Sequence, residues 1–132
     1  KEPMNFHSNK AIYIQIADLI CEKILSNTFK EEERIPSVRE LAVDLEVNPN
    51  TVMRTYEYLQ DLEIISNKRG VGFFVNNNSI ERVTIYLKKE FMEQELPNLF
   101  KNMKILAINI SEIEKLYLQY LQHNIKNSNE KK

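Results

Sequence analysis

The sequence predicts a mainly α-helical fold with one small β-hairpin in its N-terminal half and a short helical region at its C-terminal end. Three observations lead to this prediction. Two short segments with helical spacing of apolar residues follow each other between residues 36 and 62. Both glycines of the chain lie between two β-prone runs directly after them. Apolar residues at helical spacing then continue from residue 80 to residue 121.

The first helix is expected between residues 10 and 27, after an N-terminal arm of residues 1–9 that carries little pattern. Its apolar stripe repeats every fourth residue and consists of Ile12, Ile16, Ile20 and Ile24. Such a stripe predicts a core helix of a three-helix bundle. In the connection that follows, Phe29 is the expected anchor, and Arg34 with Ile35 is expected to add a short strand to the sheet.

Residues 36–62 predict two short helices joined by a tight turn. Ser37 precedes the first apolar stripe and Glu40 lies three residues on, which is the pattern of a capping box. Asn48 is a suitable N-cap for the second helix, and Pro49 takes its first position, where a missing N–H costs nothing. The two stripes are Val38, Leu41, Ala42 and Leu45, then Val52, Tyr56 and Leu59. This is the helix-turn-helix pattern, whose second helix enters the major groove of DNA.

A β-hairpin is expected directly after the second helix. The β-prone runs are Ile64-Ile65 and Phe73-Phe74-Val75, and between them lie Lys68, Arg69, Gly70 and Gly72. The two cations suit contact with phosphate or with the minor groove, although a charged tip also serves solubility. Turn geometry explains the two glycines with or without DNA. A helix-turn-helix followed by such a hairpin is a winged helix.

The C-terminal region is expected to consist of helices that pair with a second copy of the chain. Ser79 is the expected cap of its first helix, and Pro97 is expected to kink the pattern or to begin a new helix. Ser111 and Glu114 form a further capping-box pattern before the last helix. Residues 80–125 carry more large apolar side chains than two or three helices bury by themselves. A two-fold partner would cover them, whereas an enclosed ligand pocket is hard to build from so few residues.

The composition fits a soluble globular chain without a metal site. The 132 residues are 42% hydrophobic and 28% charged, and neither a membrane-spanning run nor a signal-peptide pattern is present. The single Cys21 is compatible with a reducing cytoplasm. His7 and His123 have no cysteine partners at ligand spacing. The net charge is −1, and the segment from Arg34 to Val75 contains five basic and six acidic residues. Composition alone therefore does not indicate that the chain binds nucleic acid.

These motifs together resemble the DNA-binding domain of the GntR superfamily of bacterial transcription regulators. The segments that carry the resemblance are Ile35–Ala42, Val47–Val52, Arg54–Tyr56, Leu59 and Lys68–Val75. The NPNTV form of the second helix and the short C-terminal region look most like the YtrA-like subfamily. The resemblance implies that Arg39 contacts DNA, whereas a surface ion pair with Glu40 or Asp44 is the alternative. Several relatives carry arginine where this chain has Met53, so no base-reading role is transferred to that residue.

The first turn of the second helix is the expected reading end. A helix N-terminus presents free N–H groups and partial positive charge to phosphate. Asparagine pairs bidentately with adenine and threonine meets a thymine methyl or a phosphate, although Asn48 is equally explained as a plain N-cap. Arg54 lies one turn further on, within reach of a phosphate or a base edge. The expected DNA-contacting residues are Ser37, Arg39, Asn48, Asn50, Thr51, Arg54, Lys68, Arg69 and Gly70.

We therefore predict a cytoplasmic, sequence-specific DNA-binding transcription regulator that acts as a homodimer on a palindromic operator. The resemblance implies a repressor. No enzymatic activity, cofactor, metal or membrane contact is predicted, and a small-molecule effector is left open. The alternative is a winged helix that binds protein rather than DNA, against which Arg39, Arg54 and the hairpin cations argue. The predicted domains are an arm (1–9), a winged helix-turn-helix (10–76), a helical dimerisation region (77–125) and a flexible tail (126–132).

Overall fold

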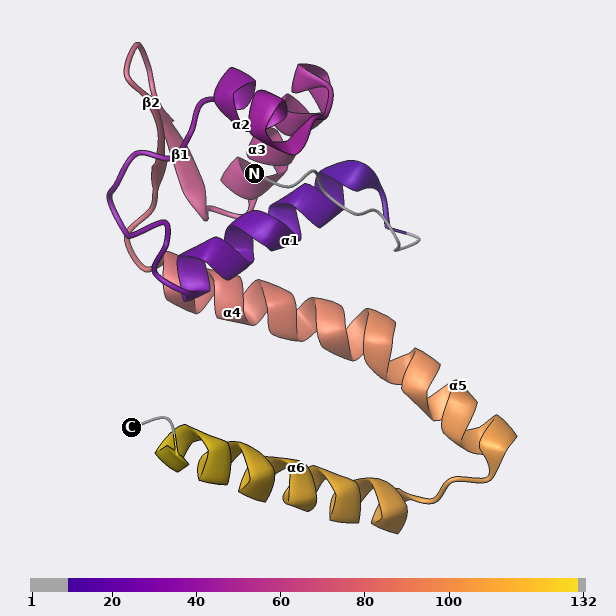
Figure 1. Cartoon of the computed structure of the whole chain (residues 1–132). Coiled ribbons are helices and arrows are strands. Elements are labelled where there is room, and N and C mark those ends of the chain that lie inside the picture. The colour runs from indigo at the N-terminus through magenta and orange to yellow at the C-terminus, as the bar shows by residue number, and fades with distance from the viewer. Residues whose placement is uncertain (1–9, 131–132) are drawn as a thin grey trace. The chain divides into compact units, whose positions relative to one another are not determined.

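The computed structural model describes residues 10–130, so the predicted N-terminal arm lies outside the described residues. The first elements are α1 (Ile12–Leu25), α2 (Val38–Leu45), α3 (Pro49–Asp61), β1 (Ile65–Lys68) and β2 (Gly72–Val75) (Figure 1). They are followed by α4 (Ser79–Glu90), the π-helical turn η1 (Phe91–Glu95), α5 (Leu96–Leu106) and α6 (Ile110–Glu130). The predicted fold class, mainly α-helical with a small β wing, is confirmed. The chain divides into a winged-helix unit that ends at Lys89 and a helical unit that begins at Glu90.

The core of the winged-helix unit forms where α1, α2 and α3 bring their apolar stripes together. The predicted stripes of α2 and α3 lie in this core, except that Val38 is half-buried against it. From α1, Ile16, Ile20 and Ile24 are buried, whereas Ile12 is exposed at the helix start. Phe29 packs against the core, as the sequence predicted for the connection after α1. Burial of these three stripes against one another fixes the orientation of α3.

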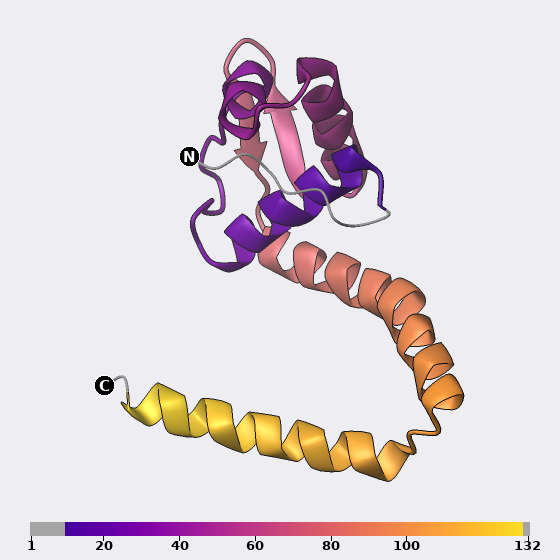
Figure 2. The ribbon, with the colours of Figure 1, turned by 45° about the vertical axis from the view of Figure 1, so that its right-hand side comes forward.

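The hairpin of β1 and β2 is antiparallel, with a register that runs from Ile65 opposite Val75 to Lys68 opposite Gly72. The predicted short strand before α2 is reduced to an isolated bridge beside the two-stranded sheet. Arg34 forms a bridge to Phe74, and the Ile35 N–H donates to the Phe73 carbonyl at 2.9 Å. In both views the hairpin tip lies at the same end of the unit as α2 and the start of α3, away from α4 (Figures 1 and 2).

Helix α4 belongs to the winged-helix unit, so the unit extends beyond residue 76, the predicted end of that domain. The Val83 side chain is fully buried in the core, and Tyr86 and Leu87 pack against it. The predicted cap by Ser79 is wrong. Its hydroxyl is buried and finds no hydrogen-bond partner among the described residues. The Arg82 N–H instead donates to the Asn78 carbonyl at 3.2 Å.

In the helical unit, the predicted restart near Pro97 is confirmed, because α5 begins at Leu96 with the proline in its first turn. The π-helical turn just before it accommodates a residue that cannot donate an N–H. The predicted capping box at Ser111 is wrong. Asn109 caps α6 by accepting from the Glu112 N–H at 3.0 Å. Helix α6 also continues to Glu130, through most of the predicted tail.

Candidate nucleic-acid interface

The start of α2 is fixed by the predicted capping box. The Glu40 N–H donates to Ser37 Oγ at 3.1 Å, and the Ser37 N–H donates to Glu40 Oε1 at 2.9 Å. The backbone hydrogen bond from Ser37 lowers the pKa of the Glu40 carboxyl, and the nearby Arg34 acts in the same direction. Capping explains Ser37 completely, and its contact with phosphate stays a prediction.

Arg39 is exposed on α2, outside the stripe that α2 buries. It lines an open hollow of about 550 Å³ together with Ala42, Val43, Val47 and Pro49. The hollow therefore joins Arg39 to the first residue of α3, and the two helix starts form one continuous surface. The alternative for Arg39 was a surface ion pair. Within residues 10–128, no salt bridge joins Arg39 to Glu40 or Asp44.

The start of α3 is capped by Asn48, whose Oδ1 accepts from the Asn50 N–H at 2.8 Å. Its first turn contains no acidic residue, so the positive end of the helix dipole is not neutralised there. The Asn48 oxygen already accepts one hydrogen bond as a cap, which leaves it one lone pair for any contact with a base. Asn50 is exposed and Thr51 half-buried in the same turn, so Asn50 is the better placed of the two asparagines to read a base.

One face of α3 is anchored firmly in the core. Val52, Tyr56 and Leu59 are all fully buried. The Tyr56 hydroxyl donates to the Pro36 carbonyl at 2.6 Å, and its ring meets Phe73 edge-to-face at 4.8 Å between centroids. Tyr56 thus joins α3 to the segment before α2 and to the hairpin. The opposite face of α3 carries Asn50, Met53, Arg54 and Glu57, which are exposed.

Arg54 lies on this exposed face but is held from the side. Its guanidinium carbon is 4.0 Å from the centroid of the Tyr13 ring of α1. The next residue, Thr55, donates from Oγ1 to the Tyr13 carbonyl at 2.8 Å. Tyr13 therefore contacts the reading helix through both its backbone and its ring. Because α1 and α3 are far apart in the sequence, no local pattern predicts this contact.

The hairpin tip turns at Gly70, and the Val71 N–H donates to the Lys68 carbonyl at 2.8 Å. The φ angle of Gly70 is +79°, which favours glycine. Lys68 lies with its ammonium 4.2 Å from the centroid of the Phe74 ring, and Arg69 is exposed at the tip. The structure thus places the predicted tip residues together, on an element separate from α2 and α3.

Arg34 is a hairpin cation that the predicted site omits. A Cβ atom on Gly72 would lie 2.7 Å from the Arg34 Nε, so the absence of a side chain at Gly72 makes room for Arg34. The signal that could have found Arg34 is its place directly before Ile35, in the strand that the sequence predicted beside the hairpin. It adds a positive charge beside β2, next to Gly72.

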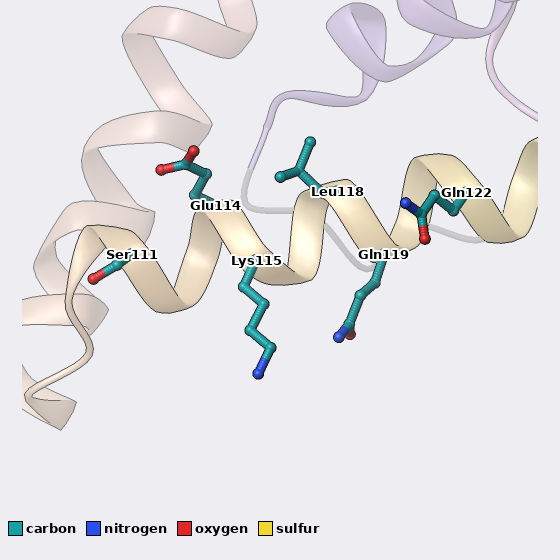
Figure 3. Close-up of a pocket in the computed structure, with 6 residues that line it drawn as sticks. All are labelled: Ser111, Glu114, Lys115, Leu118, Gln119 and Gln122. Carbon is teal, nitrogen blue, oxygen red and sulfur yellow. The ribbon is translucent and has the colours of Figure 1, made fainter.

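The two hollows found among the described residues are open to solvent rather than enclosed. Beside the hollow at Arg39, an open hollow of about 300 Å³ runs along α6. It is lined by Ser111, Glu114, Lys115, Leu118, Gln119 and Gln122. Figure 3 shows that these side chains leave a single helix in different directions and enclose no common centre. Within residues 10–130, no cluster of His, Cys, Asp or Glu could hold a metal ion, and no helix is long and apolar enough to cross a membrane.

Two capped helices at a fixed angle, an exposed face on the second and a basic hairpin beside them define a DNA-binding protein of the winged helix-turn-helix class. The chain belongs to the gntR family of bacterial regulatory proteins, and residues 12–75 match the model of that family. It is a GntR-family transcription regulator. The matched residues span α1 to the end of β2.

Relatives extend the likeness beyond the winged helix. The chain is 35% identical to the HTH-type transcriptional regulator YhcF of Bacillus subtilis over 82% of this chain and 88% of that protein. It is 32% identical to the HTH-type transcriptional repressor YtrA of the same organism, over 83% and 82% of the two chains. The predicted resemblance to YtrA-like regulators is thereby confirmed. These relatives are transcription regulators rather than enzymes.

Solved structures show the same architecture. A GntR-family transcriptional regulator from Bacteroides thetaiotaomicron is 49% identical, with a TM-score of 0.73 over 86% of this chain and 99% of the other. A GntR-family regulator from Listeria monocytogenes is 34% identical, with a TM-score of 0.68 over 86% and 98% of the two chains.

Proposed function

We propose that this regulator is a cytoplasmic repressor that binds a palindromic operator as a homodimer, with α3 of each protomer in the major groove. One observation carries the proposal: α3 buries Val52, Tyr56 and Leu59 on one face and leaves Asn50 and Arg54 exposed on the other. A helix held so firmly on one side is a rigid reading element. The start of α3 lies at the end of the unit that also carries the hairpin tip (Figures 1 and 2).

The charges at this end suit a phosphate backbone on either side of the groove. Arg39 lies at the start of α2, before α3 in the chain, and Arg69 lies at the hairpin tip after it. The first turn of α3 carries no acidic residue, so the positive end of its helix dipole is available to a phosphate. In this proposal Arg39, Lys68 and Arg69 bind phosphate or groove edges, Asn50 and Arg54 read the operator, and Ser37, Asn48, Thr51 and Gly70 complete the contact surface.

The homodimer rests on the helical unit. Many of its large apolar side chains are more than half exposed, among them Phe100, Ile105, Leu106, Ile110, Leu116, Tyr117, Leu118, Tyr120 and Ile125. Such a surface is typical of an interface, and a two-fold partner would match a palindromic operator. The repressor role is supported by the relative YtrA, which is named a repressor. A dimer fixed on a promoter would exclude other proteins from it.

The proposed function is tested by selecting operators from random duplexes with the intact protein and measuring affinity against salt. A dimer that neutralises on the order of 6–10 phosphates loses about 10³–10⁵ in affinity between about 50 and 200 mM salt. Arg39→Ala should weaken operator binding at least about 30-fold in the dimer, with little change in melting temperature, because the side chain is exposed.

Arg82→Ala is the matched control. Arg82 is an exposed arginine of α4 that pairs with Glu63 at 2.8 Å, away from the hairpin tip. Its loss removes the same charge but should leave affinity within about threefold. If no duplex is selected even at low salt, the DNA-binding proposal fails and the protein-binding alternative replaces it.

A further inference from the structure

The recognition helix carries one cation whose position is set by another element. The Arg54 guanidinium stacks over the ring of Tyr13, with its carbon 4.0 Å from the ring centroid. Tyr13 lies on α1, and Arg54 lies one turn after Asn50 on the exposed face of α3. A cation over an aromatic face is attracted by the ring quadrupole.

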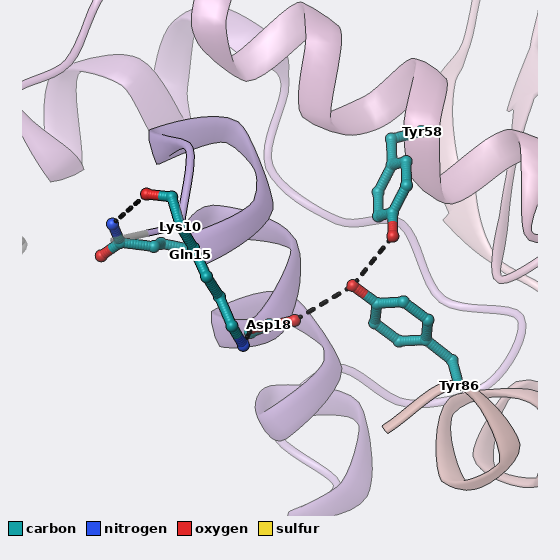
Figure 4. Close-up of polar contacts among 5 residues, drawn as sticks. All are labelled: Lys10, Gln15, Asp18, Tyr58 and Tyr86. Carbon is teal, nitrogen blue, oxygen red and sulfur yellow. Dashed lines mark hydrogen bonds and ion pairs between the residues drawn. The ribbon is translucent and has the colours of Figure 1, made fainter. Parts of the chain in front are cut away.

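The Tyr13 ring is itself held in place from behind. It meets Tyr58 edge-to-face, with centroids 5.8 Å apart and planes at 88°. Tyr58 in turn meets Tyr86 of α4 edge-to-face at 5.9 Å. The Tyr58 hydroxyl donates to the Tyr86 oxygen at 3.0 Å, and Tyr86 donates to Asp18 at 3.2 Å. Figure 4 shows this polar chain closing between α3, α4 and α1, with Lys10 on the other oxygen of Asp18.

The Tyr13 backbone is held as well, by the hydrogen bond from Thr55 Oγ1. The single proton of this hydroxyl is shared with the Thr51 carbonyl one turn earlier in α3, which lies 3.2 Å away. The Tyr13 ring that supports Arg54 is therefore fixed relative to α3 by contacts with two residues that follow Arg54 in the helix, Thr55 and Tyr58. A platform of this kind moves with the helix that it serves.

Stacking uses only the face of a guanidinium, and its five N–H donors point outward in the plane. An arginine held this way remains able to bind a phosphate or a guanine edge. An unsupported arginine on a helix surface would instead lose much rotamer freedom on binding DNA. Lys68 over Phe74 is a weaker candidate for the same effect, because an ammonium has no fixed fork to orient.

We propose that Tyr13 is a positioning residue for operator recognition: its ring holds Arg54 in the orientation in which the guanidinium contacts DNA. This inference rests on the proposed function, since it needs an operator to bind. It assigns a role in DNA binding to α1, which contributes none of the predicted contact residues. It also makes Tyr58 and Tyr86 a support for that role.

The test compares operator affinity of the intact wild type, Tyr13→Leu and Tyr13→Phe. Tyr13→Leu removes the ring and should weaken binding about 5- to 30-fold in a dimer, which loses two stacking contacts. Tyr13→Phe keeps the ring and should bind within about twofold of wild type. Repeating the Tyr13→Leu substitution in an Arg54→Met background distinguishes a role through Arg54 from a merely structural role of Tyr13. If Tyr13 acts through Arg54, Tyr13→Leu should weaken binding no further in the Arg54→Met background.

An equal loss from Tyr13→Leu with and without Arg54 overturns the proposal, as does wild-type affinity of Tyr13→Leu. Should Tyr13→Leu fail to fold, the ring-current shift of the Arg54 side-chain protons in wild type decides. An upfield shift of these protons relative to those of Arg82, which has no aromatic ring over it among the described residues, supports the stack, and equal shifts of the two arginines overturn it. If wild type selects no duplex at all, it is the proposed function that fails, and the ring-current measurement still reports whether the stack exists.

Discussion

The two units of this chain bury their apolar residues in opposite ways. In the winged-helix unit the stripes of α1, α2 and α3 are closed into one core, which also takes Val83 from α4. Among the described residues of the helical unit, Met103 is the one large apolar residue whose side chain is buried. Tyr120, for example, remains 61% exposed. The winged-helix unit therefore buries its apolar side chains within itself, whereas the helical unit leaves most of its apolar side chains exposed to solvent.

The two units differ because their proposed tasks differ. The winged-helix unit must hold α3 rigidly, because a mobile helix cannot discriminate between bases. In the proposed dimer, the helical unit must instead keep its apolar surface available for a second copy of the chain. The winged-helix unit should thus respond to core substitutions by losing stability, and the helical unit should respond to surface substitutions by losing association.

The largest effect is expected from Leu116→Glu combined with Tyr120→Glu in α6. The two exposed residues lie one turn apart on the same face, so two carboxylates there should prevent apolar pairing. The intact variant should sediment as a monomer at micromolar concentration and lose about 10²–10⁴ in operator affinity, because the second half-site is no longer tethered. Gln119→Glu, on the polar side of α6, should leave the dimer intact. A variant that still dimerises, or a monomeric wild type, would contradict the pairing role.

A smaller effect, on stability alone, is expected from Leu59→Ala in α3. Leu59 is fully buried in the winged-helix core, and its truncation should lower the free energy of unfolding by about 2–5 kcal/mol. Val43→Ala in α2 is the control, because Val43 is 77% exposed and its loss should change stability by no more than about 0.5 kcal/mol. Denaturant unfolding measures both. Equal losses would mean that the unit is not closed around Leu59.

The smallest effect is expected from Tyr56→Phe, which leaves the buried Pro36 carbonyl without its donor and should cost about 1–3 kcal/mol. Burial raises the pKa of the Tyr56 phenol. The folded state therefore keeps the proton longer than the unfolded one, and this contribution is present below about pH 10 and falls as the pH rises further. Unfolding measured at about pH 8 and pH 11 should show that the gap between wild type and Tyr56→Phe narrows. A constant gap would show that Tyr56 ionises normally.

Much of the winged-helix unit was predictable because its helix caps and turns depend on residues that are close together in the sequence. The capping box of Ser37 and Glu40, the cap by Asn48 and the turn at Gly70 each involve residues within a few positions of one another. Their geometry follows from helix and turn chemistry alone. Local signals misled where two choices were equivalent. Asn109 and Ser111 are both suitable N-cap residues for α6. The choice of Asn109 follows from the end of α5, where Ala107 has left-handed backbone angles and sets where α6 can begin.

By itself, the sequence determined the order of the helices, the helix-turn-helix, the basic hairpin and the family. Tertiary structure alone decided the rest. It placed α4 with the winged-helix unit by burying Val83, and it brought Tyr13 beneath Arg54 and Tyr56 against Pro36. The physical reason is that caps and stripes act over three or four residues, whereas these contacts join segments 20 to 42 positions apart. No periodicity encodes such contacts; they exist only once several helices have buried their stripes against one another.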